Sequence, residues 1–475
     1  MQARPLWTSQ ELIAATGGEL HGSITTAMNG VSIDSRSVAP GDIFVAIKGD
    51  AHDGHTFVAK ALQAGAGVAV VSQLTDEMRN AGPVLHVRDP LQALEAMGRA
   101  ARQWNVGKSI AVTGSVGKTS TKEMLRIAFS ATGKTHASAA SFNNHWGVPL
   151  TLARFPRDAA FGIFEIGMNH SGEITPLVAM ARPHVAIVTT IAASHLGHFA
   201  SLDEIAEAKA EIFSGVVPGG AAVINRDTPY FDLLSRRAKA AGILNVISFG
   251  KHDQADVHLK QVALHPTCSC ISVSVMGEDV TFKLGTPGLH MAMNSLAVLA
   301  AVKLVGADLA RASLALAEAK PPKGRGGQEF LKVAGGDFLL LDESYNANPQ
   351  SMAAALELLA TAAKTRKGRR IAVLGDMLEL GNFSEELHRS LLRDLDVAKI
   401  DRLYAAGPMM KHLWDAVDPS RRASCAESSV DLIAALQADL KAGDSVVIKG
   451  SLGSKMGPVA EALRQKFPIV QKEGH

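Results

Sequence analysis

Apolar residues in this chain gather in short runs that are separated by stretches with helical spacing. In the first hundred residues the runs occupy 43–47, 67–71 and 84–87, and a helical pattern covers 56–64. Runs of four or five apolar residues between polar or glycine positions are typical of buried strands. The block 1–105 is therefore predicted to be a small α/β domain.

The same alternation continues through the middle of the chain. Apolar runs stand at 110–113, 161–166, 185–191 and 221–224, with helical patterns between them. Continuous apolar runs that alternate with helices indicate a mostly parallel sheet whose two faces are both covered. We expect residues 106–320 to form a central domain around such a sheet.

A segment of prolines and glycines interrupts the pattern at 321–327. Prolines and clustered glycines continue neither a helix nor a strand, so the segment is expected to be a hinge. Beyond it, further apolar runs alternate with helices such as 351–363, which predicts a Rossmann-like α/β domain over 321–475. The runs of this block span 338–341, 370–374, 402–405 and 445–448.

Composition narrows the class of partner. A chain of 475 residues exceeds what one core usually supports, which agrees with several domains. Hydrophobic residues make up 47% and charged residues 20%, as in globular proteins, and the formal net charge is only +2. So small a charge creates no field that would attract nucleic acid or a membrane surface. We expect small-molecule partners.

Cysteine content and the N-terminal segment predict the compartment. Cys268, Cys270 and Cys425 are too few for a disulfide framework, and the Cys-x-Cys pair lacks the usual zinc spacing. Residues 1–7 contain no basic stretch before an apolar core, and no apolar segment is long enough to span a bilayer. A soluble protein of the reducing cytoplasm is expected.

A phosphate-binding loop is the strongest chemical signal. Residues 109–120 read SIAVTGSVGKTS, a buried strand that turns through glycines into Gly-Lys-Thr-Ser. Backbone N–H groups and the helix N-terminus can bind phosphate oxygens, the lysine reaches the outer phosphates, and the hydroxyl can hold Mg²⁺. Val112 replaces the usual first glycine of this motif, and a glycine-rich turn without a ligand is the alternative. The segment favours ATP binding on a P-loop-type sheet.

Polar residues follow two of the predicted central strands. Glu165 ends the run that begins at 161, and His195 comes shortly after the run 185–191. Ligands of open α/β sheets bind beyond the carboxyl ends of the strands. A carboxylate and an imidazole beside a phosphate loop can ligate Mg²⁺ or orient phosphate, although each alone could be a core polar group. Their occurrence together with the loop favours a functional site.

Lys209 lies in a predicted helix whose register can be read. Ser201 and Glu204 have the spacing of a capping box, which places Lys209 on one face with Ile205 and Phe213. Such a lysine can extend past its apolar neighbours to water. Alternatively, burial lowers its pKa, and the neutral amine can react with CO₂ to give a carbamate, an anionic metal ligand. Helix register alone leaves both outcomes open.

In the block 321–475, polar segments follow three of the predicted strands. The first, 342–349, suits nucleotide or peptide binding, although an Asx-rich turn is an alternative. The segments 374–381 and 449–451 close two other strands of the same sheet. We therefore expect the third domain to face the ATP site. The candidate binding residues of the first loop are Asp342, Glu343, Tyr345, Asn346 and Asn348.

With these residues the chain resembles the Mur ligases, the ATP-dependent amide-forming family of peptidoglycan precursor synthesis. The resemblance covers the whole length. Within the family, the stretches 34–46, 141–149, 344–349 and 374–381 are similar to the branch that adds D-alanyl-D-alanine to UDP-N-acetylmuramoyl tripeptide. The resemblance implies ATP and Mg²⁺ as cofactors, these two molecules as substrates, and a monomer.

The resemblance also implies roles for residues of the ATP site. It places Lys118 on the outer phosphates, Thr119 and Glu165 on magnesium, and His195 at a second metal site, and it makes Lys209 the lysine that is carbamylated in several members. Catalytic roles are implied for Lys118, Glu165, His195 and Lys209. The implied nucleotide contacts are Gly114, Ser115, Val116, Gly117, Lys118, Thr119, Ser120, Asn294, Arg325 and either Asp342 or Glu343. The family commonly has aspartate where this chain has Glu343.

Further implied roles concern the two substrates that are joined. The resemblance places the uridine nucleotide at Asp34, Ser35 and Arg36, and the muramoyl peptide at Asn143 and Asn144. It places ATP and the incoming dipeptide at Tyr345, Asn346 and Asn348.

The implied reaction transfers the γ-phosphoryl group of ATP to a carboxylate and lets the dipeptide amine capture the acyl phosphate, while the hinge closes the third domain against water. The alternatives are a sister ligase that adds one amino acid, a folylpolyglutamate synthetase, and a nucleotide-dependent switch ATPase. The 344–349 loop argues against the first two, and a switch would need no muramoyl substrate. The sequence does not decide between diaminopimelate and lysine in the tripeptide.

Overall fold

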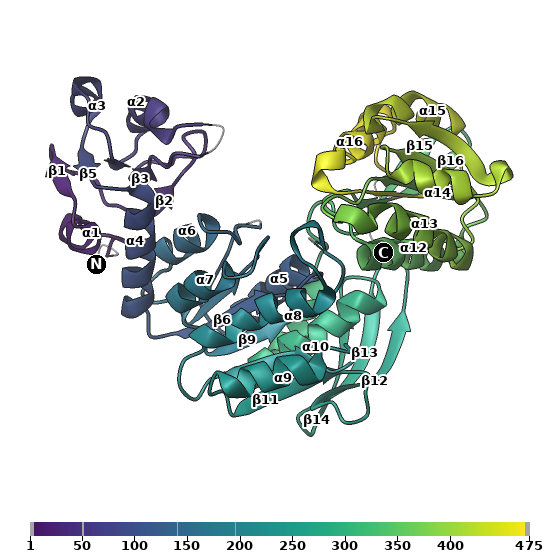
Figure 1. Cartoon of the computed structure of the whole chain (residues 1–475), viewed down its shortest axis with the longest axis horizontal. Coiled ribbons are helices and arrows are strands. Elements are labelled where there is room, and N and C mark those ends of the chain that lie inside the picture. Colours follow the sequence, from purple (N-terminus) through teal and green to yellow (C-terminus); the bar gives the residue numbers. More distant parts are fainter. Residues whose placement is uncertain (1–3, 50–51, 140, 195, 471–475) are drawn as a thin grey trace.

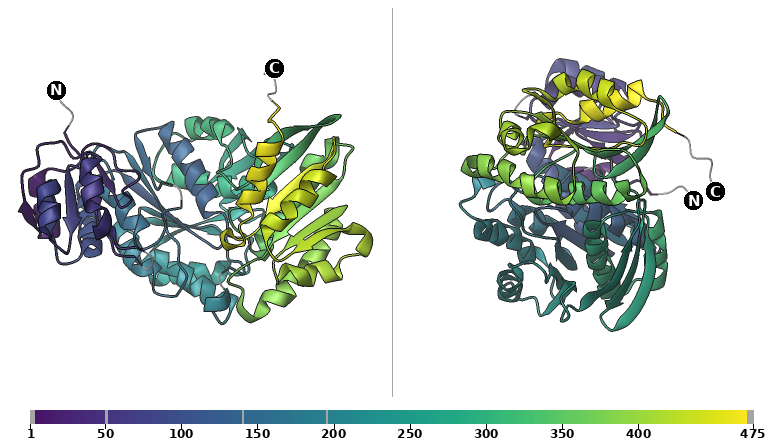
Figure 2. Two further views of the ribbon diagram at one scale, coloured as in Figure 1. Left: turned by 90° about the horizontal axis from the view of Figure 1, so that it is seen from above. Right: turned by 90° about the vertical axis from the view of Figure 1, so that its right-hand side faces the viewer.

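Three sheets follow one another along the chain, and each has helices on both of its faces (Figure 1). The computed structural model describes residues 4–49, 52–139, 141–194 and 196–470. The middle sheet lies between the other two, with the first and third domains at opposite ends of the molecule (Figure 2). The predicted three-domain α/β class is confirmed.

The first domain is built from short elements. They are α1 (Ser9–Thr16), β1 (Glu19–His21), β2 (Gly30–Ser32), β3 (Asp42–Val45), the 3₁₀ helix η1 (Gly54–Phe57), α2 (Val58–Gln63), β4 (Val68–Val71), α3 (Asp76–Ala81), β5 (Val84–His86) and α4 (Pro90–Trp104). The strand order is β1-β5-β4-β3-β2, with only the β1–β5 pair antiparallel among these described strands. The helix expected at 56–64 is split, because the Asp53 side chain accepts from His55 N and caps η1 there.

The middle domain contains the longest sheet. Its elements are β6 (Lys108–Thr113), α5 (Lys118–Ser130), β7 (Thr135–Ala137), α6 (Gly147–Ala153), β8 (Phe161–Glu165), α7 (Ile174–Ala181), β9 (Val185–Val188), η2 (Leu196–His198), α8 (Leu202–Ala210), η3 (Glu211–Gly215), β10 (Ala221–Asn225), α9 (Phe231–Ala240), β11 (Asn245–Gly250), β12 (Val257–Leu264), β13 (Ser269–Val275), β14 (Glu278–Leu284), α10 (Leu289–Leu304), α11 (Leu309–Ala315) and η4 (Leu316–Glu318). The order is β14-β13-β12-β11-β10-β9-β6-β8-β7, and every adjacent pair between β7 and β12 in this order is parallel.

The parallel part of this sheet is buried on both faces, as predicted. Ile110 and Val112 of β6 pack with α5 and α10, whereas Ala111 faces α7 and α8. The antiparallel extension β12-β13-β14 was not predicted. Its strands bury only one face, so exposed residues interrupt the apolar runs on which the sequence prediction relied.

The third domain repeats the layered arrangement. Its elements are β15 (Gly327–Val333), β16 (Gly336–Glu343), α12 (Pro349–Ala362), η5 (Ala363–Thr365), β17 (Arg370–Gly375), η6 (Gly381–Phe383), α13 (Ser384–Val397), β18 (Arg402–Ala406), α14 (Met410–Ala416), η7 (Pro419–Arg421), β19 (Arg422–Ala426), η8 (Ser429–Leu432), α15 (Ile433–Asp439), β20 (Ser445–Lys449), η9 (Leu452–Ser454) and α16 (Gly457–Lys466). The order is β15-β16-β20-β17-β18-β19, with β15 antiparallel to β16 and the other pairs parallel. Leu339 and Leu341 face α12 and α13, and Leu340 faces α16.

Specific contacts join the middle domain to its two neighbours. On one side the buried Arg102 of α4 donates from Nε to Ala181 O at 2.8 Å and from Nη2 to Arg182 O at 2.9 Å. On the other side Gly197 N donates to Glu379 O at 2.8 Å. A Cβ on Gly381 would lie 3.0 Å from Gly197 Cα, and Gly381 has φ +57°, so the contact needs glycine at 381.

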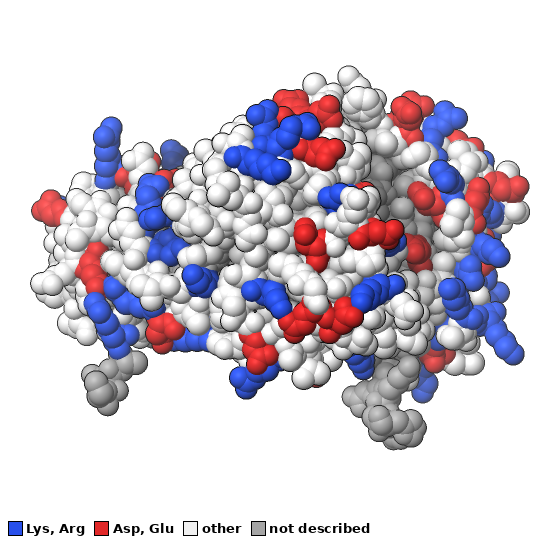
Figure 3. All heavy atoms as spheres, turned by 90° about the horizontal axis from the view of Figure 1, so that it is seen from below, with Lys and Arg blue, Asp and Glu red and all other residues white. Residues whose placement is uncertain are grey.

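Charged side chains are distributed without a dominant sign. Figure 3 shows basic and acidic residues interspersed over one face of the molecule, which agrees with the small net charge. Within the described residues, no helix is both long and apolar enough to cross a lipid bilayer.

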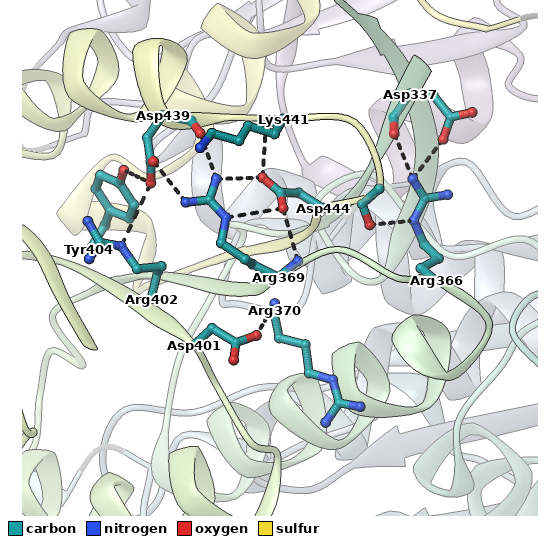
Figure 4. Close-up of polar contacts among 11 residues, drawn as sticks. Asp337, Arg366, Arg369, Arg370, Asp401, Arg402, Tyr404, Asp439, Lys441 and Asp444 are labelled. Carbon is teal, nitrogen blue, oxygen red and sulfur yellow. Dashed lines mark hydrogen bonds and ion pairs between the residues drawn. The ribbon is translucent and has the colours of Figure 1, made fainter. Parts of the chain in front are cut away.

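A network of ion pairs fixes the amino ends of the strands of the third domain (Figure 4). Arg369 donates from Nη2 to Asp444 Oδ2 at 2.7 Å and from Nη1 to Asp439 Oδ1 at 2.8 Å. Asp444 is buried and also accepts from Lys441 N, while the Tyr404 hydroxyl donates to Asp439. The Asp444 carboxylate thus ties the start of β17 to the turn before β20.

Asp444→Ala is expected to lower the free energy of unfolding of the third domain by about 3 kcal/mol, because it leaves the Arg369 guanidinium without its main partner. Hydrogen exchange of the β17 and β20 amides measures the change. Lys411→Ala, which removes the exposed pair with Asp415, should change the same amides by less than about 0.5 kcal/mol. Equal effects of the two variants would contradict a structural role for the network.

Candidate functional site

The phosphate loop follows β6 and is shaped by two glycines. Gly114 has φ +146° and Gly117 has φ +90°, and α5 begins directly afterwards at Lys118. A Cβ on Gly114 would lie 1.9 Å from Thr189 Oγ1. That hydroxyl donates to Val116 O at 2.6 Å and so braces the loop from the end of β9. The loop conformation therefore requires glycine at 114.

Val112 belongs to the strand and not to the loop. It is fully buried in β6 between Glu165 of β8 and Ile187 of β9, its register partners. Its carbonyl accepts from Ile166 N at 2.9 Å. Because Val112 replaces the first glycine of the usual motif and lies in the strand, the phosphate loop runs only from Gly114 to the start of α5.

A carboxylate and a hydroxyl meet beside this cradle. Thr119 Oγ1 donates to Glu165 Oε1 at 3.1 Å, and Asn143 Nδ2 donates to the same oxygen at 2.8 Å. Glu165 Oε2 is buried and has no hydrogen-bond partner among the described residues, and the same holds for Ser115 Oγ. An unpaired buried carboxylate oxygen next to a hydroxyl fits a hard cation such as Mg²⁺, which prefers oxygen ligands. The predicted ligand His195 lies outside the described residues.

Lys118 stands at the centre of the site. Its Nζ donates to Gly114 O at 2.7 Å, which places the amine over the loop. Burial lowers the pKa of this amine, Glu165 raises it, and Arg325 of the linker lowers it. A phosphate anion between the two cations would relieve their repulsion, which favours an anionic ligand here.

Lys209 is buried on the apolar face that its register predicted. It is 1% exposed, and Ile205 and Phe213 beside it are also buried. The alternative in which the side chain extends to water is therefore wrong. Burial holds the pKa of its amine well below the ordinary value, and the Lys118 ammonium lowers it further. A neutral amine is the form that reacts with CO₂.

The helix start that fixes this register differs in one detail from the predicted capping box. Ser201 Oγ accepts from Glu204 N at 3.2 Å, as expected. The Glu204 carboxylate, however, accepts from Ala200 N at 2.7 Å instead of returning to Ser201 N. Both bonds still satisfy free N–H groups at the start of α8, so the register holds.

One cavity of about 1080 Å³ joins the middle and third domains. The phosphate loop, the ends of β8 and β9, the start of α10 and the loop after β16 contribute to its walls. It brings together most residues that the sequence analysis selected. These are Ser115, Val116, Gly117, Lys118, Thr119, Ser120, Asn143, Glu165, Asn294, Arg325, Glu343, Tyr345, Asn346 and Asn348.

The two acids at the end of β16 have different surroundings. Asp342 Oδ2 accepts from Arg464 Nη2 at 2.8 Å, and its Oδ1 accepts from Ser344 Oγ at 2.6 Å, so both oxygens are engaged by the protein. Glu343 instead lines the cavity and lies 3.5 Å from the Lys449 amine. The geometry therefore favours Glu343 as the acid that faces a ligand.

Three other predicted residues shape the cavity wall. The Arg325 guanidinium stacks over the Tyr345 ring at 4.3 Å from its centre. The Asn294 amide lies against the phosphate loop, since a Cβ on Gly117 would be 2.8 Å from its Nδ2. Asn348 caps α12 by accepting from Ser351 N at 2.9 Å. The linker, α10 and the β16–α12 loop are thus held together around the cavity.

Other predicted residues lie away from this cavity. Arg36 pairs with Asp34 through Nη2 at 2.7 Å in a turn of the first domain that also contains Ser35, and this pairing lowers the pKa of Asp34 to about 2. Asn144 Oδ1 accepts from Gly147 N at 3.0 Å at the start of α6, so its side chain is engaged by the protein. Their implied substrate contacts remain predictions.

The cavity also contains polar residues to which the sequence analysis gave no role. The strand-end rule could have found Asn225, which ends β10, a strand that the sequence predicted. Lys251 follows β11, which was not predicted, so Lys251 carried no such signal. The polar lining residues without an assigned role include Ser141, Asn225, Asp227, Thr228, Lys251, His290 and Lys449.

A buried histidine holds the loop 376–381 next to the site. His388 Nδ1 donates to Ser384 O at 2.6 Å, so its Nε2 is the acceptor for Met377 N at 2.9 Å. Asp376, whose Oδ1 accepts from Met410 N, is 4.0 Å away. Burial lowers the pKa of His388, and this outweighs the opposite effects of the bond to Ser384 O and of Asp376. The ring is therefore neutral in the folded protein at pH 7.

The third domain is expected to lose stability as the pH falls below about 6.5, the ordinary pKa of histidine. Below that value His388 binds a proton in the unfolded chain but not in the folded protein. The free energy of unfolding therefore falls by up to about 1.4 kcal/mol per pH unit as the pH decreases. Urea unfolding between pH 5 and 8 measures this slope. His388→Gln keeps an acceptor without titrating and should flatten the slope, while an unchanged slope would exclude His388 as its source.

Family models match most of the chain. The model described as "Mur ligase family, catalytic domain" matches residues 27–104, "Mur ligase middle domain" matches 112–302, and "Mur ligase, glutamate ligase domain" matches 329–452. The three matches fall on the three domains of the structure.

Individual proteins resemble the chain over a similar length. The UDP-N-acetylmuramoyl-tripeptide–D-alanyl-D-alanine ligase of Escherichia coli is 34% identical over 464 residues, which is 96% of this chain and 98% of that protein. A crystal structure of MurF from Acinetobacter baumannii superimposes with a TM-score of 0.84 at 31% identity, covering 97% and 99% of the two chains. The MurF ligase from Thermotoga maritima in complex with ADP gives 0.76 at 26% identity, with 92% and 98% covered.

Proposed function

The chain belongs to the Mur ligase family, and from that premise we propose that it joins D-alanyl-D-alanine to UDP-N-acetylmuramoyl tripeptide with conversion of ATP to ADP and phosphate. The product is the UDP-N-acetylmuramoyl pentapeptide of peptidoglycan synthesis. One observation carries the proposal: the phosphate loop, the Thr119–Glu165 pair and the 343–348 loop of the third domain line a single cavity. The curated relative named above, matched over almost its full length, supports this choice of substrates.

ATP is needed because a free carboxylate does not acylate an amine at neutral pH. Transfer of the γ-phosphoryl group to the terminal carboxylate of the tripeptide breaks the bond to ADP and forms an acyl phosphate. The dipeptide amine then attacks the carbonyl carbon, loses a proton, and expels inorganic phosphate. Phosphoryl transfer depends mainly on positioning and charge neutralisation. The residues around the phosphate loop supply both.

Lys118 and the loop N–H groups bind the phosphates and neutralise the charge that develops on them. Thr119 and Glu165 would hold Mg²⁺, together with His195 and a carbamate on Lys209. A metal ion held there would supply positive charge that offsets the negative charge of the phosphates. The orphaned Glu165 Oε2 is the feature that favours a cation at this position.

The lowered pKa of the Lys209 amine supports the proposed carbamate. The neutral amine attacks the carbon of CO₂, loses one proton, and becomes an N-carboxylate with the donor chemistry of a glutamate. Such an anion would also face the Lys118 ammonium, which now lowers the pKa of Lys209 by repulsion. The carbamate would replace that repulsion with attraction.

Each of the three domains binds one of the reactants. We assign residues 1–105 to the UDP precursor, with Asp34, Ser35 and Arg36 on the uridine nucleotide, and residues 106–320 to ATP. Residues 321–475 close over ATP and take the dipeptide through the 345–348 loop. The muramoyl peptide passes Asn143 and Asn144 between the first two domains. Closure excludes water, which would otherwise hydrolyse the acyl phosphate. The protein would act as a monomer. Its place would be the cytoplasm, where ATP is available.

The test is to incubate the protein with ATP, Mg²⁺ and UDP-muramoyl tripeptide, add either D-alanyl-D-alanine or a single amino acid, and measure product masses. Only the dipeptide should give a product, with a mass increase of one dipeptide less one water. Tripeptides that end in diaminopimelate or in lysine, compared in parallel, identify the preferred precursor. Phosphate release at full rate without a muramoyl substrate would instead identify a switch ATPase.

A further inference from the structure

Lys449 is a buried lysine in the cavity wall to which the mechanism above gives no role. It is the last residue of β20, and its side chain is 3% exposed. In the sheet, β20 lies between β16 and β17, and Lys449 is the register partner of Glu343 and of Leu374. A charged side chain therefore emerges at the carboxyl edge of the sheet, where ligands of α/β folds bind.

The Lys449 amine contacts two residues of the loop that begins at Glu343. Its Nζ donates to Asn346 O at 2.8 Å and lies 3.5 Å from Glu343 Oε2. Both residues also line the cavity. One ammonium group thus holds the start of this loop and its fourth residue in a fixed relation.

The opposite side of the Glu343 carboxylate packs against the hinge. A Cβ on Gly326 would lie 3.1 Å from Glu343 Oε1, so the linker approaches the carboxylate closely. Gly326 N also donates to Asp342 O at 2.9 Å, and Tyr345 N donates to Gly324 O at 3.0 Å. Glu343 is thereby held between Lys449 and the segment that joins the middle and third domains.

The charges of this cluster depend on one another. Burial lowers the pKa of Lys449, the Glu343 carboxylate raises it, and Arg325 lowers it. The Glu343 side chain is itself only 13% exposed, so without Lys449 a carboxylate would remain in a poorly solvated place. Removal of either partner is therefore expected to displace the loop.

We propose that Lys449 is a positioning residue, which acts through Glu343 and Asn346 to hold the 343–348 loop against the hinge in the form that receives ATP and the incoming dipeptide. The proposal rests on the proposed ligase function. It predicts that Lys449 acts on binding of these two substrates and leaves the UDP precursor unaffected, since the first domain contributes no residue to this cluster.

The test compares Lys449→Met with Lys466→Met, which replaces an exposed lysine at the end of α16. For Lys449→Met, the KM values for ATP and for the dipeptide should rise about tenfold or more, while the KM for UDP-muramoyl tripeptide should change by less than about twofold. Lys449→Arg keeps the charge and should restore most of the binding. Lys466→Met should match the wild type. Unchanged KM values in Lys449→Met would overturn the proposal.

A second experiment separates positioning from direct ligand contact. If Lys449 acts through Glu343, the double variant Lys449→Met/Glu343→Gln should bind ADP about as weakly as the weaker single variant, measured by calorimetry. If the affinity losses of the two single variants multiply in the double variant, Lys449 contacts the ligand itself, and the positioning role is overturned. ADP binding needs no ligation, so it remains measurable if Lys449→Met is inactive, and Glu343→Gln tests the pair if Lys449→Met does not fold. Absence of pentapeptide synthesis by the wild type would refute the proposed function instead.

Discussion

Replacement of Lys118 by alanine is expected to reduce ligation by about 10³-fold or more. The lysine is the basic group of the phosphate loop, and removal of one charge that stabilises a phosphoryl-transfer transition state typically costs about 10² to 10⁵ in rate. Its amine lies over the loop at 2.7 Å from Gly114 O, where it can reach a bound phosphate. The rate of pentapeptide formation at saturating substrates measures the loss, which should appear in kcat as well as in the KM for ATP.

Lys108→Ala is the matched control for this experiment. Lys108 is the first residue of β6, whereas Lys118 is the first residue of α5, beyond the phosphate loop that follows this strand. Lys108 is exposed and should tolerate alanine with near wild-type activity. Near-normal turnover of Lys118→Ala would remove the phosphate loop from the mechanism.

Replacement of Lys209 is expected to reduce ligation strongly, and in the case of Lys209→Met to do so without destabilising the fold. Lys209→Ala removes the amine that would carry the carbamate, and loss of an anionic metal ligand should reduce activity by about 10²-fold or more. Lys209→Met should have the same effect while filling nearly the same space among Ile205 and Phe213. Because a buried amine is costly to desolvate, Lys209→Met should be at least as stable as the wild type in thermal unfolding.

The carbamate itself has an independent signature. Wild-type activity should fall in buffer depleted of CO₂ and return on addition of bicarbonate, whereas Lys209→Met should not respond. A bound CO₂ should also be visible as a carbonyl signal in ¹³C NMR after addition of labelled bicarbonate, and it should be absent from Lys209→Met. A wild type that shows neither effect, or a Lys209→Met that turns over normally, would contradict the role given to Lys209.

The sequence predicted those parts of the fold whose signal is local. Strands such as β6 and β16 read as uninterrupted apolar runs because both of their faces are buried. The β12–β14 extension buries one face only, so its residues alternate and were not recognised. The helix expected at 56–64 is split into η1 and α2, and the Asp53 side chain that caps η1 is an interaction that propensity does not report.

The candidate site also contains both residues that the sequence could predict and residues that it could not. Most of the residues that motif and strand-end reasoning selected line the cavity, among them Lys118, Glu165 and Glu343. It could not choose between Asp342 and Glu343, because the choice depends on Arg464, a residue more than a hundred positions away that engages Asp342. Lys449 received no role for the same reason.

The sequence by itself determined the phosphate loop, the class of the three domains, and the apolar face on which Lys209 lies. Each of these follows from neighbouring residues, through glycine geometry, strand burial or helix register. Only the tertiary structure decided that Lys209 is cut off from water, that Glu343 and not Asp342 faces the cavity, and that Lys449 holds Glu343 against the hinge. These outcomes depend on strand order and domain packing, which bring together charges that lie far apart in the chain and set how much water each one retains.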